Sequence, residues 1–444
     1  MPRPPILAGF ACLILFATSA RAERVVIDYW EKWTGFEAAA MGEIVDKFNA
    51  SQDHITVRYS SISQVDLKLM LAIAGRKPPD VAGIWSYNVP VYVENNALHP
   101  LDALCKEYGI SGQEYLPIVW KLCTYRDRIW ALPTTPASTA LYWNKKIFRD
   151  AGLDPDHPPA SIEELEQINE KISVRGPDGK YRVFGHLPEE PGWWRSCWGY
   201  WFGGRLWDGH GRITTTDEGN HRALDWIQSY PRRFGQHDIS GFLESAGNFA
   251  SSASPFISGR VAMVMQGPWE WNFLRRFSTG PIDIGVAPFP SAAGPSAPPV
   301  TVVESDILVI PAGSPHVKEA FEFIAFVNRQ DNLEQFCSAQ CSFSPLVNVS
   351  DAFWKNHPHP YIRTFYDLAR SPGAFSPPLI PDWTLYKSQF DQNIKEVWAL
   401  RMEPSTAQED VQHRIQKDLD RRILRWDAIK GTLTKEWDQE DVVP

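Results

Sequence analysis

Hydrophobic and polar positions follow two different periods along the first part of the chain. Val25, Val26 and Ile27 form a short β-branched run that predicts a strand over residues 24–30. From residue 36 to 49 the apolar positions recur at helical spacing. A strand at 55–59, a helix at 65–74 and a strand at 81–85 are predicted to follow. Strands and helices that alternate with short connections predict a parallel sheet with covering helices.

The same order of elements returns in the middle of the chain. Strands are predicted at 139–143, 260–266 and 306–310, and helices at 162–174 and 217–230. Ser314 and Pro315 have the types expected at the N-cap and the first position of another helix. The chain is therefore predicted to contain two stretches of α/β structure.

The last third of the chain is predicted to be helical. Ser405 and Gln408 have the spacing of a capping box, which would begin one long helix. Gly431 would end it. The apolar face of this helix is formed by Val411, Ile415, Leu419 and Trp426.

The first 22 residues have the composition of a secretory signal peptide. A short positive start at Arg3 is followed by an apolar run from 6 to 17 and by an A-x-A site at 20–22. The run is about a dozen residues, fewer than the about 20 that span a bilayer. Cys12 lies in a poor lipobox, so a lipid anchor is not expected. We expect cleavage after Ala22 and a soluble, periplasmic mature protein.

Charge and aromatic content narrow the class of protein. The 444 residues carry 44 basic and 53 acidic side chains, a net charge of −9, and loss of Arg3 and Arg21 would make it −11. This acidic balance argues against a nucleic-acid partner. The 19 Trp are more than core packing calls for. A single chain of this length can bury its own cores, and a monomer is expected.

Export would permit disulfides, and the mature chain keeps several cysteines. Cys105 and Cys123 are the preferred pair, Cys337 and Cys341 the next, and Cys197 is expected to be a buried small hydrophobe. No C-x-x-C or H-E-x-x-H motif occurs, so neither a metal nor another cofactor is expected.

Short segments in a fixed order carry a family resemblance. They are F-N at 48–49, P-P-D-V at 78–81, L-H-P-L at 98–101, A-L-P at 131–133, L-Y-W-N-K-K-I-F at 141–148, A-G-L-D at 151–154, Gly203-Gly204, S-G-R-V-A-M at 258–263, G-P-W-E-W at 267–271 and I-G-V-A-P-F-P at 284–290. Together they resemble the bacterial extracellular solute-binding proteins of the carbohydrate-uptake type, the family that includes maltose-binding protein. The resemblance covers nearly all of residues 23–431.

This resemblance implies the type II periplasmic-binding-protein fold. Each of two α/β lobes would have a mainly parallel sheet with flanking helices, and a ligand cleft and hinge would lie between the lobes. The implied first lobe is 23–133 plus 306–345, and the second is 138–302 plus 348–444. The chain would cross near 133–138, 302–305 and 345–348. Such proteins close around their ligand by hinge motion.

Aromatic side chains are the main candidates for ligand contact. A sugar presents C–H faces to flat rings and hydroxyls to fixed polar groups. The aromatic candidates are Trp30, Trp33, Trp85, Trp193, Trp194, Trp269, Trp383 and Tyr386. The resemblance gives the strongest case to Trp269, since the first Trp of its motif faces the sugar in the family. Trp198, Trp201 and Trp271 are expected to pack in the core.

Polar candidates occur at the same predicted strand ends and crossings. They are Glu31, Lys32, Gln64, Asn88, Ser138, Gly267, Glu270 and Glu304. Ala137 stands where maltose-binding protein has an acidic side chain, which argues against a maltodextrin ligand. The acidic pairs 163–164 and 189–190 are expected to be solvated.

Three classes of function fit these features. The leading hypothesis is a non-enzymatic receptor that captures a carbohydrate and delivers it to the permease of an ABC importer. A secreted glycoside hydrolase would need two carboxylates across the scissile bond, for which Glu270 and Glu304 are the obvious pair. The same fold could also bind a polyol, a glycerophosphodiester or a compatible solute. A phosphate would require Arg or a helix N-terminus, and a quaternary ammonium an aromatic cage.

Overall fold

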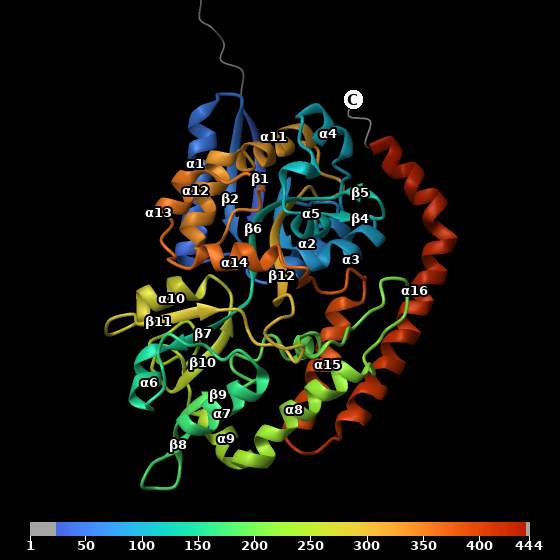
Figure 1. Cartoon of the computed structure of the whole chain (residues 1–444). Helices are drawn as coiled ribbons and strands as arrows, with labels where there is room; N and C mark the ends of the chain where they lie inside the picture. The colour runs from blue at the N-terminus through green and yellow to red at the C-terminus, as the bar shows by residue number, and fades with distance from the viewer. Residues whose placement is uncertain (1–23, 441–444) are drawn as a thin grey trace, which may run out of the picture.

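Two β-sheets with helices packed around them organise the chain, one in the upper and one in the lower half of Figure 1. The computed structural model describes residues 24–440, so the predicted signal peptide lies outside the described residues. We call the two halves the first and the second lobe. The lobe limits derived from the resemblance stay a prediction.

The first sheet contains the strands predicted at the start of the chain. Its order is β13-β12-β3-β1-β2, and β6 pairs with β12 beside this row. The pairs of β1 with β2 and with β3 are parallel, whereas β12 runs antiparallel to β3 and β6. The bounds are β1 Val25–Glu31, β2 Ile55–Ser61, β3 Val81–Trp85, β6 Leu132–Ser138, β12 Val300–Val309 and β13 Gly373–Phe375. A short hairpin, β4 Thr124–Tyr125 and β5 Arg128–Ile129, lies outside it.

Apolar helix faces cover this sheet. The helical spacing predicted at 36–49 is confirmed in α1, where Met41, Ile44 and Phe48 are buried in one cluster with Ile27 of β1. The helices of this lobe are α1 Gly35–Ser51, α2 Val65–Ala74, α3 Val89–Glu94, α4 Asp102–Glu107, α5 Pro117–Leu122, α11 Val317–Val327 and α12 Gln330–Gln340, with short 3₁₀ turns at Ser86–Asn88 and Gly112–Glu114.

The second sheet has the order β11-β7-β10-β9-β8 and differs from the expected parallel arrangement. Among its described strands only β10 and β9 pair in parallel. A tight turn through Gly179, at φ 78°, joins β8 to β9, and so short a connection permits only an antiparallel hairpin. The bounds are β7 Ala140–Asn144, β8 Val174–Arg175, β9 Tyr181–His186, β10 Val261–Gln266 and β11 Ile284–Ala287.

The helices around the second sheet bury most of the tryptophans that were expected in the core. Trp198 and Trp201 are almost fully buried in the 3₁₀ helix η3, Arg195–Phe202, which confirms that expectation. Trp271 is half-buried and stacks on His359. The other helices are α6 Lys145–Asp150, α7 Ile162–Ile172, α8 Glu218–Phe234, α9 Gln236–Glu244, α10 Glu270–Phe277, α13 Asp351–Asn356, α14 Ile362–Ala369 and α15 Trp383–Trp398.

The C-terminal helix α16, Pro404–Glu440, contacts both lobes and runs along one side of the molecule (Figure 1). Val411 and Ile415 are buried in the cluster of the second sheet. Trp426 and Trp437 instead pack with Trp130 in a cluster of the first lobe. This continuous rod therefore bridges the lobes outside the crossing strands.

Three predicted helix boundaries are wrong. Gly431 does not end α16, because the packing of Trp437 beyond it stabilises further turns. Gln408 does not cap this helix, since its side chain donates to the carbonyl of Thr215 and lies 2.9 Å from Nδ1 of His221. Ser314 accepts from the amide of His316 and donates to Asp80, and α11 begins only at Val317.

The predicted disulfides are absent from the described structure. Cys123, Cys337 and Cys341 are free and buried, so neither the Cys105–Cys123 nor the Cys337–Cys341 bridge forms. The thiol of Cys337 donates a hydrogen bond to the carbonyl of Thr134, and the thiol of Cys341 donates one to the side chain of Asn272. The two sulfur atoms therefore contact different elements. Cys197 is buried, as expected.

Within residues 24–440, no helix combines the length and the apolar character that crossing a bilayer requires.

Candidate functional site

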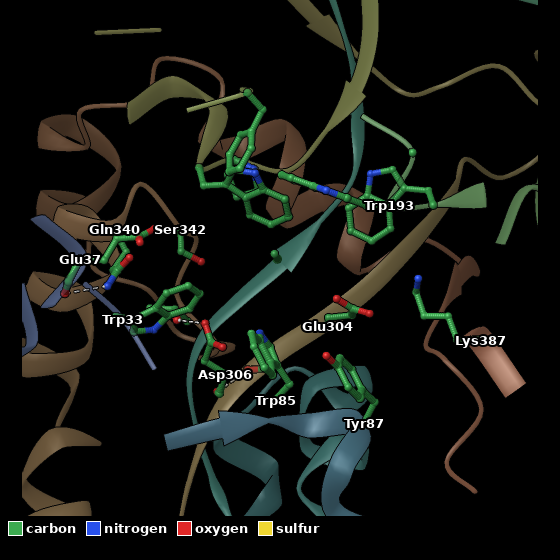
Figure 2. Close-up of a pocket in the computed structure, with 18 of the residues that line it drawn as sticks. Trp33, Glu37, Trp85, Tyr87, Trp193, Glu304, Asp306, Gln340, Ser342 and Lys387 are labelled. Atoms are coloured by element: carbon green, nitrogen blue, oxygen red, sulfur yellow. Dashed lines mark hydrogen bonds between the residues drawn. The ribbon is translucent and has the colours of Figure 1, made fainter. Parts of the chain in front are cut away.

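A cavity of about 640 Å³ lies between the two lobes, against β6 and β12 (Figure 2). This volume is within the range of small-molecule sites. Both lobes and the strands β6 and β12 contribute its walls. The lining residues are Trp33, Glu37, Trp85, Tyr87, Thr135, Ala137, Gly192, Trp193, Trp194, Arg195, Phe249, Pro268, Trp269, Phe273, Glu304, Ser305, Asp306, Gln340, Ser342, Trp383, Thr384, Lys387 and Asp391.

Three tryptophan rings of the second lobe form one wall. The ring of Trp269 lies 6.2 Å from that of Trp193 and 6.3 Å from that of Trp194, centroid to centroid. β10 ends at Gln266, and the turn through Gly267 places Trp269 at the start of α10. A Cβ at Gly267 would lie 2.2 Å from the Trp269 ring, so glycine is required for this ring position.

The opposite wall comes from the first lobe. Trp85 ends β3, and its ring is nearly parallel to that of Tyr87, at 6° and 6.1 Å between centroids. Trp33 follows β1 and also lines the cavity. A ligand enclosed here would have flat aromatic faces on two sides, an arrangement that suits a ring with apolar C–H faces.

Lys32 supports this wall from below. Its ammonium group lies 2.9 Å from a carboxylate oxygen of Asp306 and 3.1 Å from one of Glu31. It also lies 4.7 Å from the ring centroid of Trp33 and 5.2 Å from that of Trp85. Burial alone would lower the pKa of Lys32, but the two carboxylates raise it above its usual value. Lys32 therefore stays charged and fixes both rings.

Two other cavity carboxyls have strongly perturbed protonation. Burial raises the pKa of Glu304 to about 7; Lys387 opposes the shift and Asp306 adds to it. Burial also raises the pKa of Glu37 to about 7, with Asp306 adding to the shift and Lys32 opposing it. Both groups therefore exchange protons near neutral pH, where a ligand can select either form.

The basic side chains at the cavity edge are paired. Arg195 donates to Glu189 at 2.6 Å, and the ammonium group of Lys387 lies 2.5 Å from Asp391. The pair at 189–190 is thus not solvated as expected. Glu189 is buried against Arg195, and burial raises the pKa of Glu190 to about 7.

The structure brings seven of the residues predicted from sequence to the cavity: Trp33, Trp85, Trp193, Trp194, Trp269, Glu304 and Trp383. Three more lie directly behind its walls, namely Glu31, Lys32 and Gly267. Glu31 accepts from the hydroxyl of Tyr29 at 2.7 Å and from the Lys32 amide, so its contacts are internal.

The remaining predicted residues do not line the cavity. Ser138 donates to the carbonyl of Phe365, and Asn88 donates to Asp66. Tyr386 is fully buried and donates to the carbonyl of Leu206, because its position in α15 turns it toward the core. Gln64 is exposed before α2, and Trp30 is half-buried in β1.

Glu270 also lies outside the lining. It is 2 % exposed, and burial raises its pKa well above the usual range, with Glu190 adding to the shift. It follows Trp269 in the first turn of α10 and is not among the residues that line the cavity.

Several lining residues were not predicted. Glu37 lies in the first turn of α1, and Asp306 lies in β12 two residues after Glu304. Lys387 and Asp391 are one helical turn apart in α15, beginning four residues after Trp383. The i, i+4 spacing of Lys387 and Asp391 after the candidate Trp383 was the one sequence signal that could have predicted these two lining residues. Among residues 24–440, no group of three potential metal ligands comes together.

A two-lobed α/β fold with a solute-sized cavity at the crossing strands defines a receptor that encloses a small ligand. Residues 33–333 match the sequence family of bacterial extracellular solute-binding proteins, and the chain belongs to that family. Membership places the protein outside the cytoplasm. The relatives and solved structures described below are named as binding proteins or with a bound sugar.

Two named relatives show how far the sequence has diverged. The sn-glycerol-3-phosphate-binding periplasmic protein UgpB of Yersinia pestis is 20% identical over 426 residues, 89% of this chain and 93% of the relative. The maltotriose-binding protein of Pyrococcus abyssi is 21% identical over 367 residues, 79% of this chain and 74% of the relative.

Solved structures share the fold over most of the chain. The mannobiose-bound protein CpMnBP1 superposes with a TM-score of 0.78 at 22% identity, covering 88% of this chain and 99% of that one. The maltotriose-bound MalE domain of Bdellovibrio bacteriovorus gives a TM-score of 0.72 at 17% identity, covering 90% and 100%. The two-lobed fold expected from the sequence is confirmed.

Proposed function

We propose that the protein is the solute-binding receptor of an ABC importer and that it captures a sugar or oligosaccharide between its lobes. One observation carries this proposal: aromatic walls from both lobes face carboxyl groups on the strand that crosses between them, Glu304 and Asp306 of β12. Rings bind sugar faces, and fixed carboxyls accept hydroxyl hydrogen bonds. Relatives named for mannobiose and maltotriose support the same ligand class.

The location of the receptor and its mode of action follow from this role. The receptor is exported by the signal peptide, cleaved after Ala22, and acts in the periplasm as a monomer. It closes around the sugar by bending at the crossing strands and delivers it to permease subunits in the inner membrane. Neither a nucleic acid nor a cofactor takes part.

Intrinsic tryptophan fluorescence and melting curves test this function. The mature protein is titrated with monosaccharides, disaccharides, longer oligosaccharides, polyols and betaines. A saturable shift with one class of sugar is expected, and Trp269→Ala is expected to weaken it about tenfold or more. Trp207→Ala, a half-buried tryptophan outside the cavity, is the matched control. Saturation only with a polyol or a betaine would contradict the sugar assignment.

The hydrolase alternative is not favoured. It required Glu270 and Glu304 on either side of one bond, but only Glu304 lines the cavity. We propose that the protein is not an enzyme. Incubation with the sugar that binds is expected to release no reducing ends, and sustained release that is lost in Glu270→Gln would contradict this.

A further inference from the structure

The basic side chains at the cavity have carboxylate partners, whereas two of its carboxyl groups have none among the described residues. Within the described residues, each basic side chain that lines or supports the cavity is held by a carboxylate. These pairs are Arg195–Glu189, Lys387–Asp391 and Lys32–Asp306. The carboxyls of Glu37 and Glu304, in contrast, take part in no hydrogen bond or ion pair within residues 24–440. The cavity therefore offers surplus negative charge and no spare positive charge.

Glu304 occupies the centre of this imbalance. Figure 2 shows its carboxyl between Trp193 on one side and the rings of Trp85 and Tyr87 on the other, with Lys387 farther along the cavity. The charged or titratable groups around it are Asp306 on its own strand, Tyr87 and Lys387 from the other walls, and the thiol of Cys197. Arg195 and Asp391 also line the cavity. A carboxylate surrounded by rings and an acidic neighbour is stabilised most by a cation.

We propose that the ligand is a saccharide that carries a protonated amine, and that its ammonium group binds at Glu304 between the ring faces of Trp85 and Trp193. This inference rests on the proposed function, because it assigns a chemical class to the same sugar site. The ammonium group supplies hydrogen bonds to Glu304, and its charge is attracted to both ring faces. The remaining sugar hydroxyls are left for Glu37 and Asp306.

An anionic ligand is disfavoured by the same geometry. A phosphate would have to break the pair of Arg195 with Glu189 or of Lys387 with Asp391. The helices α1 and α10 carry the acidic residues Glu37 and Glu270 in their first turns, which oppose an anion at those helix ends. A phosphate ester, the ligand class named for the UgpB relatives, is therefore disfavoured relative to a cation in this cavity.

Matched saccharide probes test the inference by calorimetric titration of the mature protein. Mannobiose, maltose and cellobiose are each compared as the neutral sugar, as the 6-amino-6-deoxy derivative and as the 6-phosphate. An alkyl amine stays protonated to about pH 9. At pH 7.5 the amine of the fitting disaccharide is expected to bind about tenfold more tightly than its parent, a gain of about 1.4 kcal/mol. The phosphate is expected to bind most weakly.

Glu304→Gln is expected to remove the advantage of the amine over the neutral parent, because the amide still accepts hydrogen bonds but carries no charge. Glu190→Gln is the control, because Glu190 also has a pKa of about 7 but does not line the cavity. Melting curves establish that both variants fold. Equal weakening of amine and parent by Glu304→Gln would overturn the inference.

Proton release gives a second readout that a structural role would not move. A bound ammonium favours the carboxylate form of Glu304, so affinity for the amine is expected to rise about tenfold from pH 6 to pH 8. Titrations in buffers of different ionisation enthalpy are expected to show about half a proton released at pH 7 and close to one at pH 6, because Glu304 is half protonated near pH 7. Tighter binding of the neutral sugars would overturn the inference and leave the proposed function standing. Binding of no saccharide at all would overturn both.

Discussion

The contacts of Lys32 come from the fold and could not be predicted from its position in the sequence. Sequence reasoning placed it beside the ligand as a contact residue. The structure instead holds its ammonium group between Asp306 and Glu31, beneath the rings of Trp33 and Trp85. A buried ion pair of this kind fixes the position of neighbours, and removing one partner leaves an uncompensated charge.

Asp306→Asn is therefore expected to destabilise the protein. It removes one of the two carboxylates of Lys32, and breaking a buried pair costs about 3–5 kcal/mol. Glu31 still faces the ammonium group, and burial raises the pKa of Asp306 although Lys32 opposes the shift. Both facts place the expected loss at or below the lower figure. Urea unfolding would measure it, with Lys146→Ala, in an exposed pair, as the control. An unchanged unfolding midpoint would contradict the support role.

Substitution of Glu304 is predicted to stabilise the protein, in contrast to substitution of Asp306. Its pKa is raised in the folded protein, so the native state binds more protons than the unfolded chain between about pH 4.5 and 7, and stability falls across that range. Glu304→Gln removes this loss. The variant is expected to gain about 1–3 kcal/mol at pH 8 and little at pH 5, measured by thermal melting without ligand. A gain equal at both pH values would contradict it.

Gly267 links backbone geometry to binding. An added methyl group would meet the Trp269 ring at 2.2 Å, and the ring has to move. Gly267→Ala is expected to weaken sugar binding about tenfold while the melting temperature falls by only a few degrees. Fluorescence titration beside a melting curve separates the two effects. Gly280→Ala, in open space, is the control.

At the scale of elements, local patterns predicted most strands and helices well. The run at 81–85 matches β3, and the helix predicted at 65–74 matches α2. The errors occurred where contacts between residues far apart in the sequence determine the local structure. Gly431 ends no helix because Trp437 packs on Trp130, residues far apart in the sequence. Tyr386 and Trp383 are neighbours in α15, but only Trp383 reaches the cavity, and their sequence does not reveal the helix rotation.

At the C-terminal end of α16, the contacts of Trp437 are predicted to stabilise the protein. Trp437 is fully buried, its ring centroid lies 4.8 Å from that of Trp130, and its indole donates to Asn96. Trp437→Ala is expected to cost about 3–5 kcal/mol if the whole chain unfolds together. Leu424→Ala, at a position 71% exposed, is expected to cost little. Hydrogen exchange confined to residues near 426–440 would show that this end instead unfolds locally.

At the scale of the whole molecule, the order of segments carried more information than any one motif. The resemblance correctly predicted two lobes, although the second sheet is mostly antiparallel and identities to solved structures are about a fifth. The charge pairing of the cavity was beyond sequence reasoning. Arg195 and Lys387 look available for an anion until the fold brings Glu189 and Asp391 against them.

Closure of the lobes is a measurable change in shape. Binding of the sugar is expected to reduce the radius of gyration in small-angle X-ray scattering, because the walls from the two lobes approach each other. Trp269→Ala at the same ligand concentration is expected to show a smaller reduction. An unchanged scattering curve at saturation would contradict hinge closure.

The bridging course of α16 has a consequence for how this receptor can evolve. Since its two ends are held by different lobes, relative lobe motion strains either the Trp437 contacts or the helix itself. That strain enters the apparent dissociation constant for every ligand equally, because it does not touch the cavity. Substitutions near Trp130 would shift the working concentration of the receptor without reordering its preferences among solutes. Mutations could then change the affinity of the receptor and its specificity independently of each other.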